Sequence, residues 1–280
     1  MRAGSDYSIS MIGRRVTGMC PYCAAPGREG YRSLGLLRCS GCGLLFRFPQ
    51  PKEEDLAEFY KTEWQNPEAS AVTGATDESV ARYYALNLAR TVGRKDLAGL
   101  HVLELGAGRG NFARALMSLG ADVIASDPYS YKQLESMGVK SVPSLDDLPR
   151  RLSFDIAVSN SVIEHLAAPW RVLRDLRGRL VERGWLYVST PNASGLAACI
   201  ENAEWSQAKN PGHLFLFTSQ CLRRVLIDSG YCSVIRHRWL VRHSSGLSRR
   251  ALHTALQLTH LGGEIHYTAR RADREADYDG

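Results

Sequence analysis

The stretch Glu-Leu-Gly-Ala-Gly-Arg-Gly, residues 104–110, decides the fold because it separates two different hydrophobic patterns. The mostly apolar run from His101 to Leu105 predicts a short buried strand. After the stretch, apolar residues at helical spacing from Phe112 to Leu119 predict an amphipathic helix that ends at Gly120. The glycines allow the backbone to pass close to a ligand, and the helix N-terminus offers N–H groups without partners. This strand–loop–helix unit predicts a ligand-binding α/β domain.

An acidic residue follows the next predicted strand. Residues 122–125 predict that strand, and Asp127 closes it, seventeen residues beyond Gly110. The crossover is expected to be right-handed and the two strands parallel, so a ligand is expected at their carboxyl ends. There, Asp127 can accept hydrogen bonds from both hydroxyls of a ribose. The loop alone is weak evidence, but the loop, its flanking elements and this acid together indicate a nucleotide-type cofactor.

The type of cofactor depends on Glu104 and Asn111. NAD is the alternative, but its fingerprint has a small residue at the sixth position of the loop, where this chain has Asn111. NAD also brings a pyrophosphate, which the Glu104 carboxylate would repel, whereas the same carboxylate attracts the sulfonium and ammonium groups of S-adenosylmethionine. We therefore predict an S-adenosylmethionine site formed by Glu104, Gly106, Gly108, Gly110, Asp127 and Asn160.

Further segments of the chain resemble the class I S-adenosylmethionine-dependent methyltransferase superfamily. They are the fourth strand at 154–160, a Glu-His segment at 161–165, a helix at 169–181, the fifth strand at 184–192, a segment at 212–218 with the helix after it, and the last strands at 233–240 and 263–270. The resemblance extends over roughly residues 99–240. It implies an α/β, Rossmann-like fold with a seven-stranded, mostly parallel sheet and helices on both faces. The Glu-His segment is similar to that of the quinone-biosynthesis O-methyltransferases.

Four of the seven cysteines form two closely spaced pairs, Cys20 with Cys23 and Cys39 with Cys42, separated by fifteen residues. Each pair can present two thiolates to one tetrahedral metal, and segment 31–38 can form the hairpin that brings the pairs together. The spacing predicts a structural zinc, because four sulfur ligands leave no open position. The alternatives are two disulfides, which a cytoplasmic location disfavours, or free thiols. Similar zinc ribbons precede this domain in bacterial methyltransferases of secondary metabolism and sugar modification.

The ribbon also carries arginines interleaved with aromatic side chains. They are Arg28, Arg32, Arg38 and Arg47 with Tyr22, Tyr31, Phe46 and Phe48. Such side chains can bind and stack on nucleic acid, or they can form the small core of the ribbon and its contact with the main domain. A net charge of +6 and a pI of 9.0 permit nucleic-acid binding, but no block of Lys and Arg exceeds two residues, which favours solvated helix faces.

Three regions follow from these features: a zinc ribbon at 1–50, a helical cap or linker at 51–98 and a class I methyltransferase domain at 99–280. In the cap, acidic residues and then apolar residues at helical spacing, ending at Tyr60, predict a first helix. Residues 66–74 predict a loop, and a second helix is expected from Thr76 to about Val92. Its Tyr83 and Tyr84 either line the substrate pocket or pack on the sheet.

Methyl transfer is an in-line displacement in which the protein mainly aligns the reactants and excludes water. A hydroxyl acceptor also needs a general base. His213, after the turn at 210–212, is our first candidate for this base, and His165, beside Glu164, is the second. The alternative for each is a histidine that only fixes a loop. Some quinone O-methyltransferases are thought to hold a divalent metal with Glu-x-x-Glu-His, but Ser161 replaces the first Glu here, so we expect no catalytic metal.

The leading hypothesis is an S-adenosylmethionine-dependent methyltransferase that acts on a small molecule, in specialised metabolism, and contains a structural zinc. The alternatives are an RNA methyltransferase whose ribbon binds nucleic acid, and a non-catalytic S-adenosylmethionine-binding protein. No Asn-Pro-Pro-Tyr motif follows segment 154–160, which counts against the amino-methyltransferases of adenine or glutamine. The sequence has no apolar run of about 18 residues and no signal peptide, so we expect a cytoplasmic protein without a membrane partner.

Overall fold

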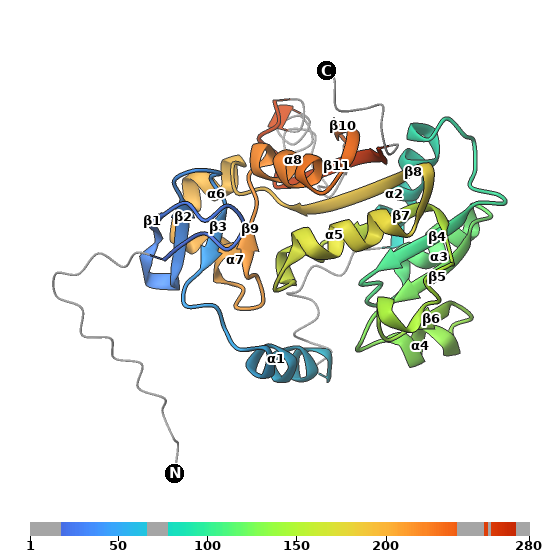
Figure 1. Cartoon of the computed structure of the whole chain (residues 1–280), viewed down its shortest axis with the longest axis horizontal. Coiled ribbons are helices and arrows are strands. Elements are labelled where there is room, and N and C mark those ends of the chain that lie inside the picture. The colour runs from blue at the N-terminus through green and yellow to red at the C-terminus, as the bar shows by residue number, and fades with distance from the viewer. Residues whose placement is uncertain (1–17, 66–77, 240–254, 257–258, 273–280) are drawn as a thin grey trace, which may run out of the picture.

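The computed structural model describes residues 18–65, 78–239, 255–256 and 259–272 (Figure 1). Within this part of the chain the main sheet has seven strands in the order β10-β11-β8-β7-β4-β5-β6. Their bounds are β4 (His101–Leu105), β5 (Asp122–Ser126), β6 (Lys140–Val142), β7 (Phe154–Asn160), β8 (Leu180–Pro191), β10 (Tyr231–His237) and β11 (Glu264–Arg271). Strands β4 to β8 are parallel, and β11 pairs antiparallel with both β8 and β10. The predicted seven-stranded, mostly parallel sheet is confirmed.

Helices cover both faces of this sheet, as expected (Figure 1). The main ones are α2 (Glu78–Thr91), α3 (Asn111–Ser118), α4 (Tyr131–Ser136), α5 (Pro169–Gly178) and α8 (Ser219–Asp228). Leu103 of β4 belongs to the hydrophobic cluster under α5 and α8, whereas its neighbour Val102 belongs to the cluster under α2 and α3. Successive residues of a strand point to opposite faces, so a strand covered on both sides is apolar throughout. This explains the mostly apolar run that identified β4, in which Glu104 is the buried exception.

A second, smaller sheet contains the cysteine segment. Its order is β1-β2-β3-β9, with β1 (Gly27–Tyr31), β2 (Leu36–Cys39), β3 (Leu45–Arg47) and β9 (Phe215–Leu216). The β1–β2 pair, joined through η1 (Arg32–Leu34), is the hairpin expected between the cysteine pairs. Strand β9 comes from far along the chain and pairs antiparallel with β3. The ribbon therefore shares its sheet with the region beyond residue 99. The predicted domain boundary at residue 50 stays a prediction.

The remaining elements are short, apart from the first cap helix. They are α1 (Glu53–Gln65), α6 (Leu196–Glu201), α7 (Ser206–Lys209), η3 (Leu145–Asp147), η4 (Ile163–His165) and η5 (Asn202–Glu204). The two predicted cap helices correspond to α1 and α2, whereas Thr76 and the predicted loop 66–74 lie outside the described residues. No helix among the described residues has the length and apolar character needed to cross a bilayer.

Predicted element boundaries were wrong in two parts of the chain. The helix predicted over 169–181 ends at Gly178, and β8 begins at Leu180 instead of Gly184. Leu180 fits the helical spacing of the preceding leucines, but it is buried because it pairs with Phe154 at the start of β7. Strand β10 likewise begins at Tyr231, two residues before the predicted Ser233, while Leu240 lies outside the described residues. In both cases sheet pairing, which periodicity does not encode, set the boundary.

Candidate functional site

The glycine-rich loop leaves β4 in a conformation that requires its glycines. Gly106, Gly108 and Gly110 have φ angles of 70°, 53° and 76°, in the left-handed region that other residues avoid. Space is also limited, because a Cβ on Gly106 would lie 2.4 Å from Cγ2 of Val162, and one on Gly110 would lie 2.6 Å from Cδ2 of Leu134. The loop thus turns tightly against its neighbours and leads into the N-terminus of α3.

Asp127 closes β5 and holds the loop from the neighbouring strand. Its Oδ2 accepts a hydrogen bond from the Gly108 N–H at 2.9 Å, and its Oδ1 accepts from the N–H groups of Tyr129 and Ser130, each at 2.9 Å. A carboxylate offers about four acceptor positions, so roughly one position, on Oδ2, is left after these three bonds. That oxygen can accept from a ribose hydroxyl, and the predicted contact of Asp127 with both ribose hydroxyls stays a prediction.

Glu104 lies in β4, directly before the loop, and its side chain is almost entirely buried, with 2% of its surface exposed. Its Oε2 has no hydrogen-bond partner among the described residues. Burial, and then the nearby Asp127, raise the pKa of Glu104 to about 8. A buried carboxyl group without a partner is costly, and a cation beside it removes that cost by stabilising the ionised form. The predicted residues therefore fit a cationic cofactor such as S-adenosylmethionine.

Asn160, the last of the predicted cofactor residues, ends β7 at the same edge of the sheet. Its side-chain oxygen accepts a hydrogen bond from Oγ of Ser189 at 2.6 Å, which fixes the orientation of the amide. The structure thus brings the glycine loop, Asp127 and Asn160 to the carboxyl ends of three adjacent parallel strands. Their contact with a cofactor stays a prediction.

The two histidine candidates meet next to this edge. His165 lies in η4, after β7, and His213 lies in the loop before β9, yet their ring centroids are only 4.6 Å apart. His165 Nδ1 is 3.0 Å from the Gly212 carbonyl oxygen, and His213 Nδ1 is 2.9 Å from that of Gln207. Since a carbonyl oxygen only accepts, both Nδ1 atoms carry the hydrogen and both Nε2 atoms keep a lone pair.

Both histidines are neutral at pH 7. Burial lowers the pKa of His165 to about 4. Burial, followed by the charge of His165, lowers the pKa of His213 to about 3. A neutral imidazole with a lone pair on Nε2 can accept a proton from an acceptor hydroxyl, although its low pKa makes it a weak base. The bonds from both Nδ1 atoms to backbone carbonyls are also consistent with the alternative, in which the histidines only fix the loop.

Glu164 completes this cluster and is fully buried. Its Oε2 accepts from Oγ1 of Thr190 at 3.0 Å, its Oε1 has no partner among the described residues, and burial raises its pKa to about 8. Ligand atoms of Glu164, His165 and His213 all lie within 4.8 Å of one another, so this set could also hold a divalent cation. The sequence reasoning considered only the position of Ser161 and missed the third donor, His213.

Tyr60 of α1 is a site residue that the sequence analysis missed. Its hydroxyl donates to the Gly212 carbonyl oxygen at 2.8 Å and lies 2.8 Å from His165 Nδ1. Its ring centroid is 5.8 Å from that of Tyr129, two residues after Asp127. Tyr60 therefore connects the cap helix α1 to the histidine cluster and, through Tyr129, to the segment that follows Asp127. In the sequence it appeared only as part of an apolar helix face, and nothing in that pattern indicates this reach.

Tyr84, by contrast, packs on the sheet. Its side chain is buried, its hydroxyl donates to Oε2 of Glu264 at 2.7 Å, and its ring centroid lies 4.9 Å from that of His266 and 5.8 Å from that of Trp239. Tyr83 beside it is half-buried. Of the two alternatives stated for these tyrosines, Tyr84 follows the structural one.

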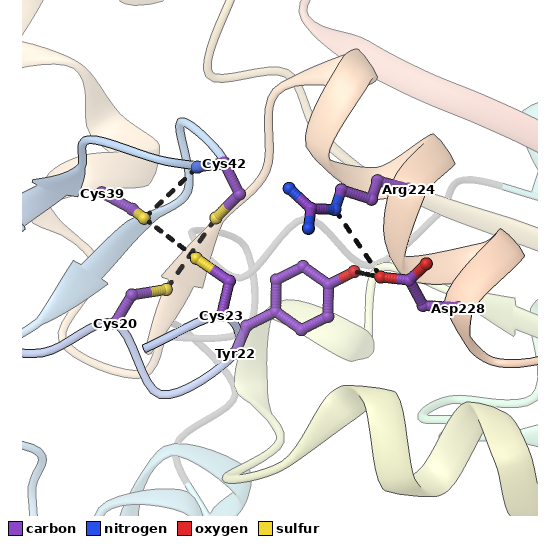
Figure 2. Close-up of polar contacts among 7 residues, drawn as sticks. All are labelled: Cys20, Tyr22, Cys23, Cys39, Cys42, Arg224 and Asp228. Atoms are coloured by element: carbon purple, nitrogen blue, oxygen red, sulfur yellow. Dashed lines mark hydrogen bonds and ion pairs between the residues drawn. The ribbon is translucent and has the colours of Figure 1, made fainter. Parts of the chain in front are cut away.

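The four cysteine side chains converge on one point, as Figure 2 shows. Sγ of Cys20 lies 3.8 Å from that of Cys42, and Sγ of Cys23 lies 3.3 Å from that of Cys39. Four sulfurs around a tetrahedral zinc, each about 2.3 Å from it, are separated by about 3.8 Å. The N–H groups of Gly41 and Cys42 also donate to Sγ of Cys39, each at 3.3 Å. All four cysteines are free, so the arrangement fits a metal site and not the disulfide alternative.

Comparison with known proteins gives a consistent family. A family model described as a methyltransferase domain matches residues 76–235, more than half of the chain. The ubiquinone biosynthesis O-methyltransferase of Xanthomonas oryzae pv. oryzae is 32% identical over 125 residues, which are 40% of this chain and 52% of that protein. The tRNA U34 carboxymethyltransferase of Stutzerimonas stutzeri is 29% identical over 160 residues, which are 52% of this chain and 49% of that protein. The chain spans about half the length of the curated relatives it matches.

Solved structures share the fold. The 1,6-didemethyltoxoflavin-N1-methyltransferase of Burkholderia thailandensis, solved with 1,6-didemethyltoxoflavin and S-adenosylhomocysteine, has a TM-score of 0.55 at 18% identity and covers 84% of this chain and 98% of its own. An S-adenosylmethionine-dependent methyltransferase of Mesorhizobium loti has a TM-score of 0.51 at 19% identity, covering 67% of this chain and 98% of its own. At these identities the likeness concerns the fold alone. By its matching family model and its sheet, the chain belongs to the methyltransferase-domain family and has the class I fold of the S-adenosylmethionine-dependent methyltransferases.

Proposed function

We propose that the protein transfers a methyl group from S-adenosylmethionine to a small-molecule acceptor. The observation that carries this proposal is the buried Glu104 carboxyl, whose Oε2 has no hydrogen-bond partner among the described residues, beside the glycine loop and Asp127, a combination that suits a cationic cofactor. When bound, S-adenosylmethionine supplies an activated methyl group on its sulfonium. We assign Glu104 to the cationic part of the cofactor and Asp127 to its ribose. We assign Asn160, at the end of β7, to the cofactor site as well.

On the acceptor side, His165 and His213 present Nε2 lone pairs. We propose that an acceptor hydroxyl is oriented by these rings and passes its proton to Nε2, first of all that of His213, as its oxygen attacks the methyl carbon in line. The methyl–sulfur bond would break in this displacement, with S-adenosylhomocysteine as the leaving group. Tyr60 covers this point from α1 and helps to exclude water. An oxygen nucleophile is favoured because the relatives from Xanthomonas are named O-methyltransferases. The names of the relatives carry nothing specific to specialised metabolism, so the proposal is limited to the class of acceptor.

The structure of the ribbon favours a small acceptor over RNA. Phe46 is buried, the Tyr22 ring packs 5.5 Å from that of Trp170, and the Tyr31 hydroxyl donates to the Ala198 carbonyl oxygen. The Arg47 guanidinium is hydrogen-bonded to backbone carbonyls. These four side chains are thus engaged inside the protein, which is the alternative to stacking on bases, whereas Arg28 and Phe48 of the same ribbon are exposed. We also propose that the four cysteines bind one structural zinc, which the sulfur arrangement fits.

RNA methylation is the second candidate, because one relative is named a tRNA U34 carboxymethyltransferase and the chain carries a net charge of +6. The experiment is to incubate the protein with S-adenosylmethionine labelled in the methyl group and with either a panel of phenols and catechols or bulk tRNA. Label in the extractable small molecules supports the proposal, and label in tRNA refutes it in favour of RNA. RNA binding would also weaken steeply with added salt, unlike that of a neutral small acceptor.

Two further arms test the residue roles. His213→Ala should abolish most label transfer while leaving S-adenosylmethionine affinity within about threefold of the wild type, because the histidine lies on the acceptor side. Activity that disappears with a chelator of divalent cations while the four cysteines retain their zinc, and returns with one added metal, would instead assign Glu164, His165 and His213 as ligands. Binding of S-adenosylmethionine without transfer to any acceptor would support the third hypothesis, a non-catalytic binding protein.

A further inference from the structure

We propose that the ribbon is a brace for the acceptor side of the site, and that Arg47 is the positioning residue through which it acts. The segment that Arg47 positions is 205–214, which contains the short helix α7 and is called here the His213 loop. The inference rests on the proposed function, because a fixed His213 matters only if His213 acts on the acceptor. Its test needs neither the acceptor nor methyl transfer.

Arg47 ends β3, and its half-buried guanidinium bonds only to backbone carbonyls in the contacts observed. Nε donates to His213 O at 3.0 Å, Nη1 to Leu34 O at 2.9 Å, and Nη2 to Asn210 O at 2.6 Å and Ala208 O at 3.2 Å. One side chain therefore ties η1 of the ribbon to three positions of the His213 loop. The planar fork of a guanidinium can serve several acceptors in fixed directions, which a lysine ammonium cannot do.

Backbone pairing continues this connection. Residues Leu45 and Phe46 of β3 pair with Leu216 and Phe215 of β9, directly after the His213 loop. The Arg47 N–H donates to Leu214 O at 3.0 Å. On its other side, Leu214 donates its N–H to the Glu164 carbonyl oxygen at 2.8 Å. The loop is therefore held between the ribbon and η4, which carries His165.

The cysteine end of the ribbon is anchored separately on the main domain (Figure 2). The Tyr22 hydroxyl, between Cys20 and Cys23, donates to Asp228 of α8, which also lies 3.6 Å from Nε of Arg224. The Tyr22 ring packs 5.5 Å from that of Trp170 on α5. The ribbon thus has two attachments, one at α5 and α8 and one at the His213 loop, with β3 between them. Because the ribbon is fixed on α5 and α8, it can hold the His213 loop in a defined position.

The orientation of His213 depends on the loop that Arg47 holds. The His213 ring bonds through Nδ1 to Gln207 O, within the same loop, and faces His165. If Ala208, Asn210 and the His213 carbonyl lose their common donor, Gln207 can move and the ring loses its fixed tautomer. Among the described residues, no observed hydrogen bond joins the Arg47 side chain to the proposed cofactor residues of β4 and β5, so affinity for the cofactor should be independent of this change.

The test is hydrogen–deuterium exchange of the full chain, loaded with zinc, in four forms: wild type, Arg47→Ala, Arg47→Lys and Arg28→Ala. Arg28 is an exposed arginine on β1 of the same ribbon and serves as the matched control. We expect amides of the His213 loop to exchange at least about tenfold faster in both Arg47 variants, because bonds to a charged donor are lost, and to be unchanged in Arg28→Ala.

Two further readouts separate positioning from general loosening. In nitrogen spectra of histidine-labelled protein, His213 should change from one Nδ1–H tautomer to a mixture in Arg47→Lys. Affinity for S-adenosylmethionine should stay within about twofold of the wild type. Unchanged loop exchange in Arg47→Lys, or an equal loss of protection across β4 and β5, overturns the proposal. If Arg47→Ala does not fold, Arg47→Lys decides. If the wild type does not bind S-adenosylmethionine, the proposed function fails while exchange still tests the brace.

Discussion

Binding of S-adenosylmethionine should release a proton from Glu104. In the free protein, burial and Asp127 hold the pKa of Glu104 at about 8, so at pH 7 about nine-tenths of the molecules carry the proton. A bound cation stabilises the carboxylate and lowers this pKa, so binding at pH 7 should release about 0.9 proton per cofactor, falling to about 0.1 at pH 9. Because only the ionised form attracts the cation, affinity should rise about tenfold from pH 6 to pH 7 and level off above about pH 8.

Titration calorimetry in buffers of different ionisation enthalpy measures the released protons directly. Glu104→Gln has nearly the same volume but cannot ionise, so it should release none and lose the pH dependence of affinity between pH 6 and pH 8. Glu164, whose pKa is also raised to about 8, requires its own control. Glu164→Gln should keep the full proton release, because that side chain lies on the acceptor side. A wild type that binds equally well at pH 6 and pH 8 without releasing protons would refute the assignment of Glu104 as the cation partner.

Three further predictions concern the other parts of the site. Asp127→Ala should weaken S-adenosylmethionine binding by about 100-fold or more in calorimetry, because three backbone N–H groups lose their acceptor; wild-type affinity would contradict the pocket. Zinc content by mass spectrometry should be about one per chain and should fall in Cys39→Ser; a folded, metal-free wild type would end the zinc proposal. Gly106→Ala should lower the free energy of unfolding by about 2–4 kcal/mol in urea, and adding Val162→Ala should recover part of the loss; strict additivity of the two changes would argue against their contact.

Sequence reasoning recovered the part of the fold that is encoded locally. The strand before Gly106 and the helix after Gly110 are read directly from apolar spacing, and the positive φ angles at both glycines show why the loop needs them. The hairpin between the cysteine pairs also follows from local spacing. The start of β8 was missed because Leu180 continues the helical spacing of α5 while its burial comes from pairing with Phe154.

The acceptor side was harder to predict because it depends on contacts between distant segments. His165 and His213 were named separately, and only the fold places their rings 4.6 Å apart. Tyr60 and Arg47 were seen as an apolar helix position and a ribbon arginine. Their contacts include side-chain hydrogen bonds across more than 100 residues of chain, at separations of 105 residues for Tyr60 and 166 residues for Arg47. No periodicity records such pairings.

A series of short-range contacts links the cofactor loop to the histidine cluster. Changes at the two ends of this series should have different effects, which experiment can separate. Gly106 touches Val162 so closely that a Cβ would lie 2.4 Å from its Cγ2, and Val162 leads into the turn that carries Glu164. The Glu164 carbonyl oxygen accepts from the N–H of Leu214, and the carbonyl oxygen of the preceding residue, His213, accepts from Nε of the Arg47 side chain. A change at Gly106 disturbs the first link and therefore the cofactor loop, whereas a change at Arg47 disturbs the last link and leaves that loop intact. If the ribbon were only a packing surface, both changes would reduce stability in the same unspecific way. If it is a brace, only the Gly106 change should alter cofactor affinity, and only the Arg47 change should alter the tautomer of His213.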